Sequence, residues 1–300
     1  MIYSKVLDSE IFNFVNKCES FYPNDGEVHS KEVQRESYNR LCNFFKVENP
    51  IQISTYDFKL SGTKLRKYTP KSYSDRIVFY IHGGGWVVGG LDSHDDICAE
   101  LSLITNSTVY GIDYRLAPEH RHPAALEDCI KAVKYIYETE EKKIILIGDS
   151  AGGNLVAALS DCSEVQKNHL LAQILIYPGL GNLKNNGSRL EHAQAPLLSV
   201  KDMDYYHSNY FKNENYWSDK GARPLISNTL SELPKTYIFV AQFDPLFDDG
   251  YEYYKKINEQ GGHAEFNEGK GLIHGHLRAR HCSVKAMAEF QKIINIIANL

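Results

Sequence analysis

Short, almost continuously apolar runs separated by helical patterns constrain the fold of this chain of 300 residues most strongly. A strand with one face in water alternates apolar and polar residues, whereas a strand buried on both faces of a parallel sheet does not. The runs therefore predict buried parallel strands, at 77–81, 108–112, 143–147, 172–177 and 236–240. Helical patterns separate or follow them, at 124–139, 151–162, 249–260 and 283–298. This alternation predicts an α/β fold with a mostly parallel central sheet flanked by helices.

Two regions depart from the alternation of strands and helices. Residues 1 to about 46 carry apolar side chains at helical spacing, and the run Tyr-Pro-Asn-Asp-Gly at 22–26 divides them into two helical stretches. The region between Tyr177 and Pro224 is polar and dotted with aromatic residues. Neither region continues the pattern of the sheet.

Composition excludes several classes of protein. Lys and Arg number 33 against 38 Asp and Glu, so the formal net charge of −5 leaves no basic excess for nucleic-acid phosphates or an anionic membrane surface. Hydrophobic residues make up 43% and charged residues 24% of the chain. Both values are close to globular averages, which excludes a largely disordered, collagen-like or coiled-coil chain.

Neither a membrane span nor a secretory signal is expected. No segment approaches the ~20 apolar residues that cross a bilayer, and the N-terminus reaches Asp8 and Glu10 without building an apolar stretch. The six cysteines are scattered without a C-x-x-C pair, which favours reduced, mostly buried thiols over a disulfide framework or a zinc site. These features predict a cytoplasmic protein.

The run Gly-Asp-Ser-Ala-Gly at 148–152 follows one predicted strand and opens a predicted helix. A turn this tight strains the backbone at Ser150 and brings its neighbours so close together that only glycine fits at Gly148 and Gly152. The Ser150 hydroxyl would then stand at the carboxyl edge of the sheet, above a helix N-terminus whose dipole favours negative charge. A phosphate-binding loop is the alternative, but the run lacks the Lys-Ser/Thr ending of such a loop.

A second glycine-rich run, His82-Gly83-Gly84-Gly85-Trp86, follows another predicted strand. Consecutive glycines let the backbone turn its N–H groups into open space, as an oxyanion hole requires. Ordinary turn glycines would explain this run if it stood alone. In this order and strand context, together with a G-x-S-x-G turn, it indicates acyl-transfer chemistry.

These two runs, with Tyr-Arg-Leu-Ala-Pro-Glu-His at 114–120, resemble the hormone-sensitive-lipase-like branch of the α/β-hydrolases. The run Gly-Gly-Leu-Asp-Ser-His-Asp at 89–95 is especially similar to the bacterial acetyl esterases of that branch. The resemblance implies an α/β-hydrolase fold, with 1–300 as a single domain that carries a helical cap. It places the cap at about 1–48 and 181–222, and the catalytic core at about 49–180 and 223–300.

An acyl-transfer serine needs a base and a group that orients this base, and in this fold the chain order is Ser, then Asp or Glu, then His. The resemblance carries the acid over to Asp244 and the base to His274. The family pattern is His-Gly-aromatic, so this chain departs from it at His276, and His281 follows shortly after. A metal site of the three histidines is the alternative, disfavoured because no nearby cysteine or suitably spaced carboxylate completes it.

The backbone N–H groups of Gly84, Gly85 and Ala151 are expected to form the oxyanion hole, with His82 and Gly83 supporting the loop. Several conspicuous polar residues are expected to be structural instead. The residues concerned are Arg115, Glu119 and His120 in the loop after 108–112, Asp248 and Asp249 as helix caps, and the aspartates of 92–96 at a helix that begins near Ser93.

The sequence thus predicts a cofactor-free serine carboxylesterase without a metal, acting on short-chain acyl esters through an acyl-enzyme intermediate. A small-molecule ester is the expected partner, with no nucleic acid and no stable membrane association; a homodimer stays open. Charged residues such as Lys201 and Asp204 interrupt the second cap segment, which favours a closed, aromatic-walled pocket for acyl groups of about two to six carbons over a lipid-activated lid. An amidase or lactonase on the same machinery and a non-catalytic ligand-binding protein of this fold are the alternatives.

Overall fold

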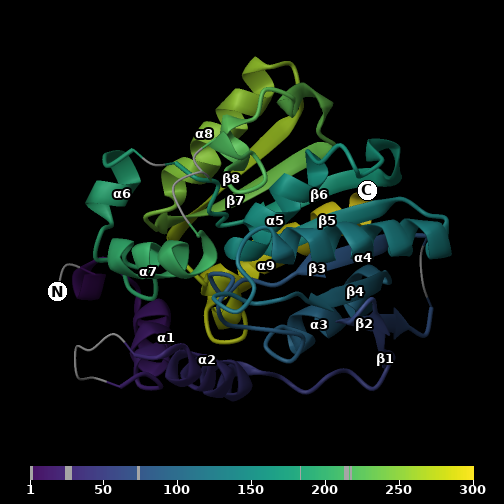
Figure 1. Cartoon of the computed structure of the whole chain (residues 1–300). Coiled ribbons are helices and arrows are strands. Elements are labelled where there is room, and N and C mark those ends of the chain that lie inside the picture. Colours follow the sequence, from purple (N-terminus) through teal and green to yellow (C-terminus); the bar gives the residue numbers. More distant parts are fainter. Residues whose placement is uncertain (1–2, 24–28, 73–74, 183, 213–215, 217) are drawn as a thin grey trace.

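The structure is a computed structural model that describes residues 3–23, 29–72, 75–182, 184–212, 216 and 218–300. Its eight-stranded sheet has the order β1-β2-β4-β3-β5-β6-β7-β8 (Figure 1). The pairs β1–β2 and β2–β4 are antiparallel, and every other neighbouring pair is parallel. The strands are β1 Ile53–Leu60, β2 Thr63–Pro70, β3 Ile77–Ile81, β4 Thr108–Asp113, β5 Ile144–Asp149, β6 Leu170–Ile176, β7 Lys235–Phe243 and β8 Ala264–Ile273.

The five predicted strands are confirmed as β3 to β7, and the mostly parallel sheet is confirmed with them. All five residues of β3 are buried, as are all six of β5, which agrees with strands covered on both faces. The edge strand β8 was not predicted, because its run Ala-Glu-Phe-Asn-Glu-Gly-Lys-Gly-Leu-Ile is largely polar and mixes buried with exposed positions.

Helices pack on both faces of the sheet. Apolar side chains of α4, α5 and α8 share one core cluster with the sheet, and those of α3 and α9 share another on the opposite face. The predicted helices are confirmed with shifts of a few residues at their ends. The helices are α1 Ser9–Glu19, α2 Lys31–Phe45, α3 Asp95–Thr105, α4 Ala124–Glu140, α5 Ala151–Ser160, α6 Gly187–Glu191, α7 Val200–Tyr210, α8 Phe247–Glu259 and α9 Val284–Asn299, with short 3-10 turns at Tyr3–Lys5, Lys167–His169, Pro224–Ile226, Leu230–Glu232 and His276–Ala279.

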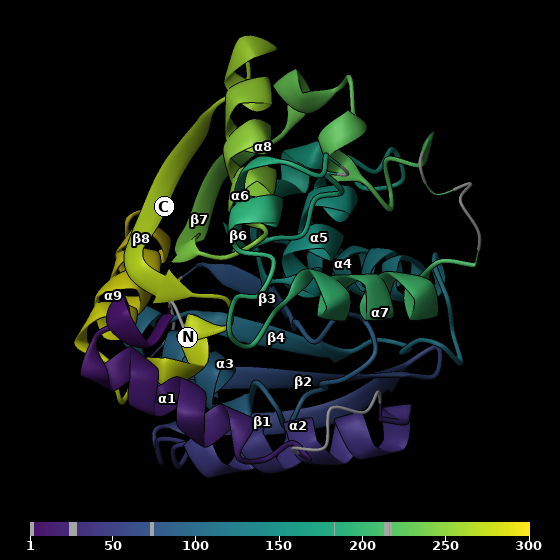
Figure 2. The ribbon, with the colours of Figure 1, turned by 90° about the vertical axis from the view of Figure 1, so that its left-hand side faces the viewer.

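The two regions that depart from the sheet pattern gather at one end of the molecule (Figure 1), and Figure 2 looks onto this end. Helices α1 and α2 come from the N-terminal region, and α6 and α7 from the 181–222 segment. Part of the predicted break at 22–26 lies outside the described residues. The guanidinium of Arg35 in α2 donates hydrogen bonds to the carbonyls of Val87 and Ala117, at 2.8 and 2.9 Å, in the loops that follow β3 and β4. Helix α2 is thereby attached to the carboxyl edge of the sheet.

Both ends of the 181–222 segment meet at one side chain. The carboxamide nitrogen of Asn154, one turn into α5, donates to the carbonyls of Gly179 and Ala222, at 2.8 and 3.0 Å. The backbone N–H of Leu225 also donates to the carbonyl of Leu180, at 3.1 Å. The chain therefore leaves and re-enters the sheet region at nearly the same point.

The prediction that Asp248 and Asp249 cap α8 is wrong. Leu246 occupies the N-cap position without a side-chain hydrogen bond to the helix. Asp249 instead accepts the backbone N–H groups of residues 180 to 182, at 2.6 to 3.2 Å, and Asp248 accepts that of Ser188, at 2.8 Å. These carboxylates accept N–H groups of a loop and of the first turn of α6, which need acceptors, and they tie α8 to the start of the 181–222 segment.

The cap prediction for the run 92–96 is also wrong. Helix α3 begins at Asp95, and its N-cap residue His94 makes no capping bond. Asp95 pairs with Arg66 and Lys46, at 2.8 Å each, and Asp96 pairs with Arg280, at 2.6 Å. Buried carboxylates take cations as partners here, because burial without a partner costs several kcal/mol for a charge.

Candidate active site

Ser150 stands at a sharp turn between β5 and α5. Its backbone has φ 54° and ψ −119°, a conformation that residues other than glycine rarely adopt. Glycines on either side make the turn feasible, because a Cβ at Gly152 would overlap the Ile81 carbonyl oxygen and one at Gly148 would lie 2.5 Å from the Gly152 carbonyl oxygen. The strand-to-helix turn therefore has the close approaches that the G-x-S-x-G spacing predicts.

Three strand ends bring Ser150, Asp244 and His274 together. Asp244 follows β7 and is fully buried, and His274 follows β8 with 8% of its surface exposed. The Nδ1 atom of His274 lies 2.7 Å from Oδ2 of Asp244, and its Nε2 atom lies 2.9 Å from Oγ of Ser150. A carboxylate can only accept, so Nδ1 carries the hydrogen, which leaves Nε2 of the neutral ring free to accept the Ser150 hydroxyl hydrogen.

The other two candidate histidines have different partners. The Nδ1 atom of His276 donates to the Ile273 carbonyl at 2.9 Å, and burial lowers the pKa of this ring to about 4. His281 lies 3.0 Å from a carboxylate oxygen of Glu100. The structure therefore brings His274, and neither of the other two, to Ser150.

The predicted oxyanion donors stand in the loop after β3 and at the first residue of α5. Gly84 and Gly85 have φ values of +115° and +58°, and the carbonyl of Gly84 accepts the N–H groups of Val87 and Val88. This turn leaves the loop compact after β3. Ala151 is the first residue of α5, where the N–H groups of a helix have no partner within the helix.

Two features near this site were not found from the sequence. A Cβ at Gly85 would overlap the ring of Tyr206, so this tyrosine of α7 lies directly on the glycine loop. Asp149 accepts the backbone N–H of Gly83 at 3.0 Å from inside the protein. Both contacts join residues far apart in the chain, and no local spacing predicts them.

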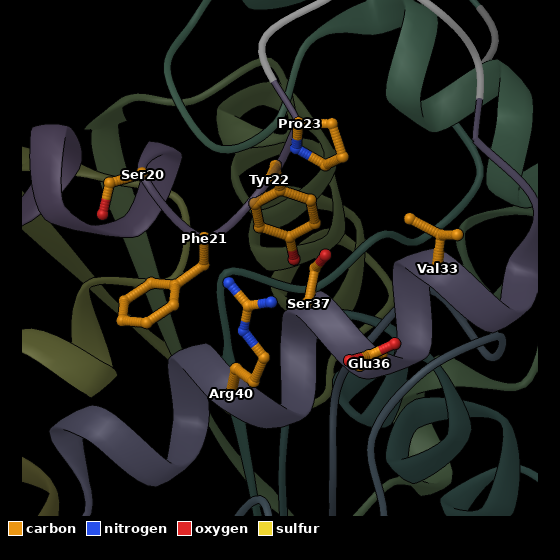
Figure 3. A pocket seen from close by; sticks show the side chains of 8 residues that line it. All are labelled: Ser20, Phe21, Tyr22, Pro23, Val33, Glu36, Ser37 and Arg40. Atoms are coloured by element: carbon orange, nitrogen blue, oxygen red, sulfur yellow. The ribbon is translucent and has the colours of Figure 1, made fainter.

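A separate cavity of about 250 Å³ lies between the end of α1 and α2 (Figure 3). In Figure 3 the hydroxyl of Tyr22 points toward Ser37, and Arg40 lies below them. Ser150 does not line this cavity, so it is not the place of the reacting atoms. The lining residues are Ser20, Phe21, Tyr22, Pro23, Val33, Glu36, Ser37 and Arg40.

The polar residues of the loop after β4 hold structure, as predicted for Arg115 and Glu119. Arg115 pairs with Asp128 and Glu127 of α4, at 2.9 and 3.0 Å. Glu119 pairs with Arg35 and Lys31 of α2, at 2.8 Å each. His120 is exposed, and its backbone N–H donates to the Leu116 carbonyl at 2.9 Å.

The cysteines are free thiols, four of them buried. Within the described residues no group of three or more His, Cys, Asp or Glu side chains could hold a metal ion. Over the same residues no helix has both the length and the apolar character that crossing a bilayer demands.

The fold and the site define a hydrolase that is built around a half-buried serine at a strand-to-helix turn, and comparison with known proteins agrees. A family model described as the alpha/beta hydrolase fold matches residues 78–278. This chain belongs to that family, in the hormone-sensitive-lipase-like branch that its motifs resemble.

The relatives and neighbours carry names of one kind. The esterase LipI of Mycobacterium tuberculosis is 34% identical over 229 residues, covering 72% of this chain and 71% of the relative. An acetyl esterase of Salmonella schwarzengrund is 31% identical over 274 residues, covering 85% and 82%. A hyperthermophilic esterase from Pyrobaculum calidifontis superposes with a TM-score of 0.88 at 26% identity, covering 98% of each chain.

Proposed function

We propose that this chain is a serine carboxylesterase that hydrolyses short-chain acyl esters through an acyl-enzyme intermediate. The single observation that carries the proposal is the continuous hydrogen-bond chain from Ser150 through His274 to Asp244, with separations of 2.9 and 2.7 Å. The names of the relatives support ester hydrolysis as the reaction type.

The first half-reaction acylates the serine. The Ser150 Oγ attacks the ester carbonyl carbon while its hydrogen passes to Nε2 of His274, and the carbonyl oxygen takes up the negative charge. His274 then gives this proton to the alcohol oxygen as the carbon–oxygen bond to the alcohol breaks. Asp244 holds the Nδ1–H tautomer throughout and stabilises the imidazolium, for which full burial and a 2.7 Å contact suit it.

The second half-reaction returns the enzyme to its starting state. A water molecule gives a proton to Nε2 of His274 and attacks the acyl carbon. The bond from this carbon to Ser150 Oγ then breaks, the serine oxygen recovers the proton from His274, and the carboxylic acid leaves. In both halves the N–H groups of Gly84, Gly85 and Ala151 are proposed to hold the oxyanion, and one such donor contributes roughly 3 kcal/mol.

We further propose that α1, α2 and the 181–222 segment act as the cap of this site. Tyr206 in α7 supports this role, because its ring lies on Gly85 and narrows the space above the glycine loop. Leu198, Met203 and Leu246 form a small apolar cluster against which Tyr206 packs, and Leu246 lies two residues after Asp244. Apolar side chains packed this close to Asp244 and to the glycine loop support a preference for short acyl chains.

A fluorophosphonate probe and a series of p-nitrophenyl esters test this function. We expect the probe to label the wild-type chain and to spare Ser150→Ala. In the ester series, turnover should peak at about two to six acyl carbons, without a jump at the solubility limit of the substrate. Turnover of amides or lactones in preference to these esters would favour an amidase or lactonase on the same residues. Absence of both labelling and turnover would leave a ligand-binding protein.

A further inference from the structure

A second group of a serine, a histidine and an aspartate lies under the glycine loop: Ser93, His94 and Asp149. The Oγ atom of Ser93 lies 2.8 Å from Nδ1 of His94, and Nε2 of His94 lies 3.3 Å from Oδ1 of Asp149. All three are buried, with 4%, 3% and 6% of their surfaces exposed. Ser93 and His94 belong to the 89–95 run of the sequence, to which the proposed mechanism gives no role.

Asp149 connects this group to the proposed reaction. It directly precedes Ser150, and its Oδ1 accepts the backbone N–H of Gly83, at 3.0 Å, and the hydroxyl of Tyr80, at 2.9 Å. Gly83 directly precedes the two glycines whose N–H groups are proposed to hold the oxyanion. A Cβ at Gly83 would collide with the Asp149 carboxylate, so only glycine allows the carboxylate this close.

We infer that His94 is a positioning residue: it holds the Asp149 carboxylate, and through it the Gly83 N–H, in the place that aligns the oxyanion hole with Ser150. The inference rests on the proposed ester hydrolysis for its kinetic consequences, but its structural part does not. His94 touches no reacting atom; it acts through Asp149 and Gly83.

The charge at Asp149 is what His94 maintains. Burial alone would raise the pKa of this carboxyl, but its contacts with the neighbouring His94 imidazole and the Tyr80 hydroxyl lower the pKa to about 2. An ionised carboxylate accepts stronger hydrogen bonds than a neutral acid does, so the Gly83 N–H is held firmly at neutral pH. Without a donor from His94 the carboxylate would be buried with fewer partners and would shift or take up a proton.

At the other end of this group, Ser93 holds the far side of the 83–90 loop. Ser93 Oγ accepts the backbone N–H of Gly90, at 3.0 Å, and lies 2.8 Å from the Gly90 carbonyl. The three residues therefore contact both ends of the 83–90 loop. Since Ser93 Oγ is occupied by backbone groups and is buried, this group is not a second nucleophilic centre.

The test compares His94→Leu, which removes the donor, with His94→Gln, which offers an N–H near the same place. His281→Gln is the matched control, because His281 pairs with Glu100 and does not touch Asp149. We expect His94→Leu to lower kcat about 100-fold with KM changed by less than about threefold, as for loss of one oxyanion donor, and His94→Gln to recover most of it. The inhibition constant of a trifluoromethyl ketone, which forms a tetrahedral oxyanion, should rise in parallel with the loss of kcat/KM.

A second measurement does not depend on turnover. Amide hydrogen exchange of peptides within 82–90 should be at least about tenfold faster in His94→Leu than in wild type or His281→Gln, because the Gly83 N–H loses a fixed acceptor. Melting temperature and circular dichroism identify a variant that fails to fold, in which case Ser93→Ala, which removes the other partner of the His94 ring, takes its place with the same expected direction.

The outcomes separate the inference from the proposed function. Unchanged exchange at 82–90 in a folded His94→Leu overturns the positioning role, even in an active esterase. A fall in kcat in which KM rises equally, or in which trifluoromethyl ketone binding stays constant, also overturns it. Faster exchange in a chain that turns over no ester supports the positioning of Gly83 and refutes the proposed function instead.

Discussion

Ser150–His274–Asp244 and Ser93–His94–Asp149 contain the same three residue types at similar distances, yet their arrangements differ in three respects. His274 turns Nε2 to its serine and Nδ1 to its aspartate, whereas His94 does the reverse. Ser150 is half-buried, whereas Ser93 is buried with its hydroxyl on backbone atoms of Gly90. The strained backbone occurs at Ser150, at φ 54°. The comparison teaches that residue types alone do not define a nucleophilic site, because the two groups differ in ring orientation, access and backbone strain.

The largest expected difference between the two groups is in the turnover that remains when each serine oxygen is removed. Ser150→Ala should lower p-nitrophenyl acetate turnover by at least about 10⁴-fold with the fold intact, because the change removes the atom that attacks. Ser93→Ala should cost no more than about tenfold, because it removes only a loop contact. Turnover by purified Ser150→Ala within tenfold of wild type would reject Ser150 as the nucleophile, and a folded Ser93→Ala that loses far more than tenfold would contradict a role for Ser93 limited to a loop contact.

Replacing the histidines sharpens the assignment of the base. His274→Ala should lower kcat by about 10³-fold or more, since the Ser150 proton then has no acceptor. His276→Ala and His281→Ala should stay within about tenfold of wild type in kcat, because these rings bond to Ile273 and Glu100. A folded His276→Ala without activity, beside an active His274→Ala, would transfer the role of base to His276.

Acid stability tests the buried environment of His276. The pKa of His276 falls from 6.5 to about 4 because of burial. Folding therefore favours the neutral ring. The contribution of His276 to the free energy of unfolding is complete above pH 6.5. It is lost as the pH falls from 6.5 towards 4, because the unfolded chain then binds a proton that the folded chain does not. The wild-type free energy of unfolding should fall by roughly 2 to 3 kcal/mol more than that of His276→Phe over this interval. Urea melts at pH 7, 5.5 and 4.5 measure the difference, and parallel curves for the two proteins would exclude His276 as a source.

The smallest expected effect concerns the length of acyl chain that the Ser150 site accepts. Tyr206→Ala should move the best acyl chain upward by about two carbons and raise turnover of the longer ester about tenfold relative to acetate, since each buried methylene contributes about 0.8 kcal/mol. Tyr206→Phe keeps the ring and should leave the profile unchanged. A chain-length series over p-nitrophenyl esters measures both, and an identical profile for all three proteins would remove Tyr206 as the limit.

Local patterns predicted much of this molecule. Continuous apolar runs identified the buried strands β3 to β7, and the resemblance to the family implied that Ser150, Asp244 and His274 would meet. Strand β8 was not predicted from its sequence pattern, because it lies at the edge of the sheet, where one side need not be apolar. The partners of Asp248 and Asp249 were not predicted because helix-cap propensity is local. Their N–H donors lie 60 to 69 residues earlier in the chain, in the loop at 180–182 and in the first turn of α6.

Asn154 has a consequence for how proteins of this kind diversify. It holds Gly179 and Ala222 with one carboxamide, so the residues between them start and finish at a single attachment point. An insertion anchored this way can be shortened, lengthened or exchanged for an unrelated one while the strands on either side keep their register. A lineage that retains this asparagine can therefore exchange this segment without rebuilding the strands that hold Ser150, Asp244 and His274 together.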